Sequence, residues 1–171
     1  MRFITLGSCC SATFALHRVR LRQENNIFEW MMAVDFGEIL DILERVCIYK
    51  QPIEVISHGK KLFFKGTNIH SKKFGPIPER LIGRLERRSR RLIDYLQSGE
   101  FIVFVRHETG LPMSHEHICR FRRIVEFVNP MAKYAMLLFC PPTTLRKTTE
   151  CINDENVFRL SSTHQTIFVL Q

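Results

Sequence analysis

The sequence has few of the features that mark low-complexity, collagen-like or membrane-spanning proteins. Its 171 residues include only eight Gly, seven Pro and one Trp, which is too little Gly and Pro for a collagen-like or low-complexity chain. No uninterrupted apolar run approaches the roughly 20 residues that a bilayer-spanning helix needs. Since 45% of the residues are hydrophobic and 14 are Phe, the chain can build a packed core, which excludes intrinsic disorder. We therefore expect one soluble domain over residues 1–171, with no membrane partner.

The motifs of common nucleotide and zinc sites are also missing. Gly7 is a lone glycine, because the chain has neither the pattern Gly-x-x-x-x-Gly-Lys nor the pattern Gly-x-Gly-x-x-Gly. In His115-x-His117-x-Cys119, a helix would bring only His115 and Cys119 onto one face. Neither a Cys-x-x-Cys pair nor a Glu completes a tetrahedral zinc set there. We therefore expect no cofactor and no metal.

The six cysteines do not have the spacing of a disulfide framework. They stand at positions 9, 10, 47, 119, 140 and 151. A chain with a sizeable core does not need such a framework, so this pattern favours free thiols in a reducing compartment. We expect a cytoplasmic protein.

Positive charge is concentrated in one segment. The chain has 25 Lys and Arg against 17 Asp and Glu, a net charge of +8, and residues 80–91 alone hold six Arg and one Glu. Four of these arginines recur at intervals of four, three and four residues: Arg80, Arg84, Arg87 and Arg91. This spacing places them on one side of a helix, away from its apolar stripe. Such a face is either a solvated surface or a docking surface for a protein or another acidic partner. No motif supports nucleic acid as that partner, because no aromatic residues interleave with the arginines.

Apolar periodicity divides the chain into alternating strands and helices. Short apolar runs predict strands over residues 2–6, 53–56, 62–64, 101–105, 134–139, 156–160 and 166–170. Apolar residues at helical spacing predict a helix around residues 12–16 and helices over 36–49, 78–97 and 114–128, while residues 67–75 are expected to form an exposed loop. Because strands alternate with helices, we predict an α/β fold. It should have three layers, with a mainly parallel sheet, helices on both faces and an inserted β-hairpin.

The first strand and helix place a cysteine where a nucleophile would be effective. Ligands of open α/β sheets bind at the carboxyl ends of strands. The loops that follow these ends in the predicted sheet are residues 7–11, 106–112, 140–144 and 161–164. Cys10 lies in the first of these loops, at the start of a helix. The helix dipole and free backbone amides lower the pKa of a thiol in such a position. A cysteine buried for packing alone is the competing interpretation.

Several short motifs follow one another in a distinctive order. The first are Thr5-Leu6-Gly7-Ser8-Cys9-Cys10, Leu21-Arg22 and Phe28-Glu29-Trp30, and the later ones are Phe63-Phe64 with His70, Arg87-Arg88 and Phe104-Val105-Arg106. Over residues 2–106 this order resembles a family of papain-like cysteine peptidases found in bacteria and large DNA viruses. Its members begin Ser-Leu-Gly-x-x-Cys and continue to Pro-Phe-Asp-Trp. The resemblance implies Cys10 as the nucleophile, His70 as the base, and ligand-binding roles for Arg87, Arg88 and Arg106.

Four positions depart from the family pattern. Thr5 replaces Ser, Ile27 replaces Pro, Glu29 replaces Asp, and Ser71 replaces the Asp beside the His. The sequence is compatible with two functions. The first is a thiol hydrolase, or a degenerate relic of one, acting on an amide or ester, with His70, or with His107 or His164 at strand ends, as the base. The second is a non-enzymatic binding or structural protein, such as a scaffold or a component of a viral particle, that docks an acidic partner through the arginine-rich helix.

Overall fold

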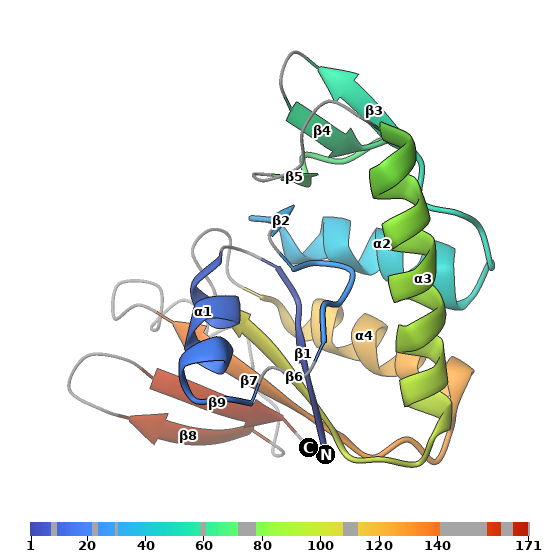
Figure 1. Ribbon diagram of the computed structural model, residues 1–171. Coiled ribbons are helices and arrows are strands. Elements are labelled where there is room, and N and C mark those ends of the chain that lie inside the picture. The colour runs from blue at the N-terminus through green and yellow to red at the C-terminus, as the bar shows by residue number, and fades with distance from the viewer. Residues whose placement is uncertain are drawn as a thin grey trace.

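The fold is that of a computed structural model of the chain (Figure 1). It describes residues 1–7, 10–21, 24–29, 31–58, 61–71, 78–107, 113–140, 157–161 and 166–170, and of residues 10, 11, 71, 78, 79, 140, 157–161 and 166–170 it describes the main chain. The helices are α1 (Cys10–Arg18), α2 (Phe36–Cys47), α3 (Pro78–Gln97) and α4 (His115–Val128). The strands are β1 (Arg2–Thr5), β2 (Met31–Met32), β3 (Val55–His58), β4 (Lys61–Phe64), β5 (His70–Ser71), β6 (Ile102–His107), β7 (Tyr134–Cys140), β8 (Val157–Ser161) and β9 (Thr166–Leu170).

β1, β6 and β7 form the parallel centre of a five-stranded sheet with the order β1-β6-β7-β9-β8. β6 pairs in parallel with both neighbours, and its Phe104 lies opposite Ile4 on one side and Met136 on the other. β8 and β9 extend the β7 edge in antiparallel fashion. Near-continuous apolar strands are typical of a sheet that is covered on both faces. The predicted parallel arrangement of the first strand with those near residues 101 and 134 is confirmed.

Helices cover both faces of this sheet (Figure 1). Because side chains alternate along a strand, β6 contributes side chains to two separate hydrophobic cores, one on each face of the sheet. Val103 and Val105 pack with Ala12 and Leu16 of α1 on one face. Phe104, on the other face, belongs to the large core that also contains buried residues of α2, α3 and α4. The prediction of a three-layer α/β fold is therefore confirmed.

A second, antiparallel sheet has the order β2-β5-β4-β3. The expected hairpin is present as β3 and β4. The sequence did not indicate β5, which lies within the expected loop over residues 67–75, or its partner β2. Both are two-residue strands in which Met32 pairs with His70, and two residues are too few to show an alternating pattern. Their pairing depends on contacts made elsewhere in the fold.

α3 is a 20-residue helix with the predicted bounds. Its buried residues are Leu81, Leu85, Arg88, Leu92 and Leu96, so one arginine occupies a position in the apolar stripe. Among the described helices, none combines the length and the apolar character needed to cross a membrane.

Candidate functional site

The carboxyl end of β1 leads into α1 through a turn at Gly7. The Leu6 amide donates to the Val105 carbonyl, 2.8 Å away, so the chain stays beside β6 for one residue beyond β1. Gly7 then has a φ of +69°, and a Cβ at this position would lie 3.0 Å from the Cβ of Ala33. Both observations favour glycine here. α1 begins at Cys10, which puts Cys10 at a helix N-terminus beside the carboxyl ends of the parallel strands, as the sequence predicts.

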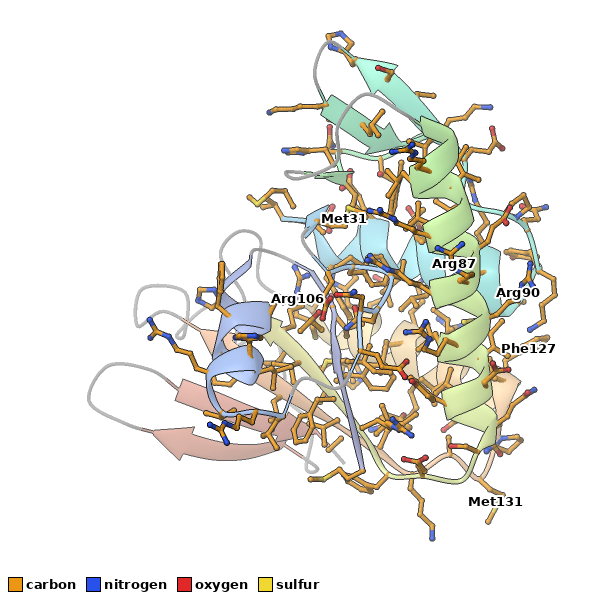
Figure 2. The ribbon with its side chains drawn as sticks, viewed as in Figure 1. Met31, Arg87, Arg90, Arg106, Phe127 and Met131 are labelled. Atoms are coloured by element: carbon orange, nitrogen blue, oxygen red, sulfur yellow. The ribbon has the colours of Figure 1, made fainter. Side chains whose placement is uncertain are left out.

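Arg106 lies buried beneath this turn (Figure 2). Its guanidinium donates to the carbonyl oxygens of Leu6, Val34 and Ala33, at 3.0, 3.0 and 3.4 Å. It also lies 4.9 Å from the centre of the Phe36 ring. The resemblance implied a ligand-binding role for this residue. These contacts give Arg106 a structural role, since it fixes the exit from β1 and the segment that leads into α2.

His107 is the last residue of β6. Thr5 pairs with Val105, so the first residues after β1 lie beside the last residues of β6. Val103 and Val105 face α1, and by strand alternation the side chain of His107 leaves β6 on that same face. The half-buried His107 and the start of α1 at Cys10 therefore lie at the same edge and on the same face of the sheet.

His70 lies on β5 in the small sheet. Its ring centre is 5.1 Å from that of Phe63, and its Nδ1 is 3.1 Å from the carbonyl oxygen of Asn68. Glu38 of α2 in turn accepts hydrogen bonds from the Asn68 amide, at 2.9 Å, and from its side chain, at 2.8 Å. If Nδ1 carries the proton that Asn68 accepts, Nε2 is left as an acceptor, which is the tautomer a general base requires.

The small sheet lies beyond the carboxyl end of β1 (Figure 1). Met32, which pairs with His70, directly precedes Ala33, whose Cβ would meet a Cβ at Gly7. The strand that carries His70 is therefore at the same end of the main sheet as Cys10.

A buried carboxylate also lies near this turn. Glu29 is 1% exposed, and the Cβ of the preceding Phe28 would lie 3.6 Å from a Cβ at Gly7. Carboxylates are seldom buried so fully. The sequence identified Glu29 only as a departure from the family pattern, because burial of a single polar residue leaves no periodic signal.

The arginine-rich face of α3 lines a separate pocket. The pocket has a volume of about 420 Å³ and is lined by Asn25, Arg84, Arg87, Arg88 and Arg91. Arg84 and Arg87 are exposed, whereas Arg88 is 8% exposed. The structure thus brings together the predicted ligand-binding pair Arg87 and Arg88, and places it apart from Arg106.

Two of these arginines hold the segment that follows α1. Arg88 donates to the Asn26 carbonyl at 3.1 Å, and Arg91 donates to the Asn25 carbonyl at 3.3 Å. Arg91 also forms an ion pair with Glu24 at 2.6 Å. A hydrogen bond from Tyr95, and then the charge of Arg91, hold the pKa of Glu24 below its ordinary value. At one end, the predicted arginine face therefore packs against residues 24–26, while Arg80, Arg84 and Arg87 are exposed.

The histidines of α4 serve the helix itself. Ser114 caps α4, and its amide donates to Nδ1 of His117 at 3.3 Å. His115 Nε2 lies 3.3 Å from Cys119 Sγ, as their spacing predicts. Among the residues that the structure describes, no group of three His, Cys, Asp or Glu side chains could hold a metal ion.

Some predicted positions lie outside the described residues. They are Cys9, Trp30, Cys151, His164 and most of the loops over 106–112, 140–144 and 161–164. A comparison of the chain with protein-family models, with curated proteins and with solved structures finds no match in any of the three.

Proposed function

We propose that the protein is a cysteine hydrolase of an amide or ester, with Cys10 as the nucleophile and His107 as the general base. The observation that carries the proposal is the position of these two residues. α1 starts at Cys10 beside the carboxyl end of β1, and His107 ends the adjacent parallel strand on the face that α1 covers. Ligands of α/β sheets bind at this edge.

Each step of such a reaction has a group available at this edge. The imidazole takes the thiol proton as sulfur attacks the substrate carbonyl carbon, and amides at the start of α1 supply hydrogen bonds to the oxyanion. The imidazolium then gives the proton to the leaving nitrogen or oxygen as its bond to carbon breaks. Water, deprotonated by the same imidazole, hydrolyses the thioester and restores the thiol.

The experiment compares three variants: Cys10→Ala, His107→Gln and His70→Gln. Each is assayed on a p-nitrophenyl ester and an anilide, and iodoacetamide labelling is followed at each cysteine across pH. We expect Cys10→Ala to abolish hydrolysis, and His107→Gln to lower kcat by at least about 100-fold. Cys10 should alkylate faster near neutral pH than Cys119, which serves as the internal control.

Two results would contradict the proposal. Slow labelling at Cys10 together with no hydrolysis would exclude the hydrolase and favour the non-enzymatic scaffold. A loss of activity in His70→Gln, with His107→Gln active, assigns the base to the histidine that the family resemblance implies.

A further inference from the structure

The arginine pocket on α3 is built by two segments that are distant in sequence. One wall is α3, whose Arg84, Arg87, Arg88 and Arg91 follow the i, i+3, i+4, i+7 spacing of a single helix face. The other wall is the segment around Asn25, which lies between α1 and β2. The pocket therefore exists only in the folded chain, in contrast to a basic run on a solvated helix.

The hydrogen bonds within the pocket hold its shape. Arg88 and Arg91 donate to consecutive carbonyls, those of Asn26 and Asn25. The Asn26 side chain hydrogen-bonds the hydroxyl of the buried Thr5 on β1. The segment facing α3 is thus tied to the main sheet as well as to the helix. Because this segment is already fixed, ligand binding would not incur the entropic cost of ordering it.

The charge of the pocket favours an anion with more than one negative charge. Four guanidinium groups line it, and the nearby Glu24 is paired with Arg91. Arg84 and Arg87 are exposed on the helix, and guanidinium groups bind phosphate oxygens through paired hydrogen bonds.

The shape and lining favour a small anion over a nucleic acid strand. The residues that line the pocket are one Asn and four Arg, without an aromatic side chain on which a base could stack. At about 420 Å³ the pocket has the size of a small-molecule site. An extended strand would instead need a basic groove that continues over several nucleotides.

We propose that this pocket binds a small polyphosphate anion, with Arg84 and Arg87 contacting the phosphoryl oxygens and Arg88 and Arg91 forming the wall behind them. The site is separate from the cysteine chemistry proposed above and does not depend on it. Arg90 provides a matched control, because it is exposed on the same helix but lines a different groove with Glu86 and Ser89. Arg87 and Arg90 are both labelled on α3 in Figure 2.

The test is isothermal titration of the full chain with inorganic tripolyphosphate at about 150 mM salt, where exposed charges are largely screened. We expect binding to the wild-type protein, at least about tenfold weaker binding to the Arg84→Gln/Arg87→Gln double variant, and nearly unchanged binding to Arg90→Gln. Circular dichroism of each variant checks that the fold is kept. Because Cys10→Ala should bind as well as the wild type, this result is independent of any hydrolysis.

Three outcomes would overturn the proposal. One is the absence of tripolyphosphate binding. Another is an equal loss of affinity in Arg90→Gln, which would show attraction to net charge alone. The third is tight binding of a 20-nucleotide RNA with which tripolyphosphate does not compete, which would make this face a nucleic-acid surface.

Discussion

The guanidinium of Arg106 donates a hydrogen bond to the carbonyl of Leu6, 3.0 Å away, in the interior of the protein. This bond joins the residue that follows β1 to β6, and the same side chain reaches the carbonyls of Ala33 and Val34. One cation therefore satisfies three main-chain acceptors where the chain enters α1 and α2.

We predict that Arg106→Met lowers the free energy of unfolding by about 3–5 kcal/mol, because it leaves buried carbonyls without their charged donor. Urea denaturation followed by circular dichroism measures the change. Arg90→Met, the same substitution at an exposed position on α3, should stay within about 0.5 kcal/mol of the wild type. Equal effects of the two substitutions would show that the buried hydrogen bonds do not stabilise the fold.

Gly7 and Gly99 allow backbone strain to be separated from steric contact. Both have a positive φ, +69° and +73°, but a Cβ would meet Ala33 at 3.0 Å at Gly7 and nothing within 4 Å at Gly99. We predict that Gly99→Ala costs about 1 kcal/mol, from strain alone. Gly7→Ala should cost about 2–4 kcal/mol, since overpacking adds to the strain. Thermal unfolding of both variants gives the comparison, and a Gly7→Ala variant as stable as Gly99→Ala would contradict it.

Apolar periodicity predicted the main sheet and the long helices because burial of a strand or helix face repeats along the chain. Residues 78–97 carry such a repeat, residues 101–105 and 134–139 are near-continuous apolar runs, and each forms the predicted element. β2 and β5 carry none, since two residues cannot show a period.

The candidate site was predictable in part. The strand, glycine and cysteine near residue 10 follow a local pattern, so the sequence could place Cys10 at a helix start. The carbonyls that the buried Arg106 meets lie 72 to 100 residues away in the chain, and the burial of Glu29 leaves no local pattern. The pocket around Arg84 and Arg87 depends equally on Asn25, which the helical spacing of the arginines could not reveal.

Arg120 of α4 joins Glu44 of α2 through two hydrogen bonds, of 2.7 and 2.6 Å. These bonds hold the pKa of Glu44 below its ordinary value of 4.5. Because the folded pKa is the lower one, the stabilisation is complete above about pH 5 and is lost as the pH falls through the folded pKa. We predict that Arg120→Gln lowers the free energy of unfolding by about 1–2 kcal/mol at pH 7, and that its difference from the wild type shrinks as the pH is lowered from 5 toward 3.

Urea denaturation at several pH values measures this difference. The control is Lys65→Gln, which breaks the exposed ion pair between Lys65 and Glu54 and should change stability little at any pH, because exposed pairs are well screened. A difference between Arg120→Gln and the wild type that stays constant down to pH 3 would show that Glu44 is not the group responsible.

Cys47 and Cys119 should differ sharply in their reaction with iodoacetamide. Cys47 is fully buried in α2, and burial raises the pKa of its thiol to about 11, so neither access nor thiolate is available at pH 8. Cys119 is only partly buried on α4. We predict that Cys119 is labelled in the native protein, and that Cys47 is labelled only when urea unfolds the chain. Mass spectrometry of the peptides after timed labelling makes the measurement. Rapid labelling of Cys47 without urea would contradict this prediction and would mean that α2 opens locally. Such an opening would also break the hydrogen bonds that Glu38 and Glu44 of α2 make with Asn68 and Arg120.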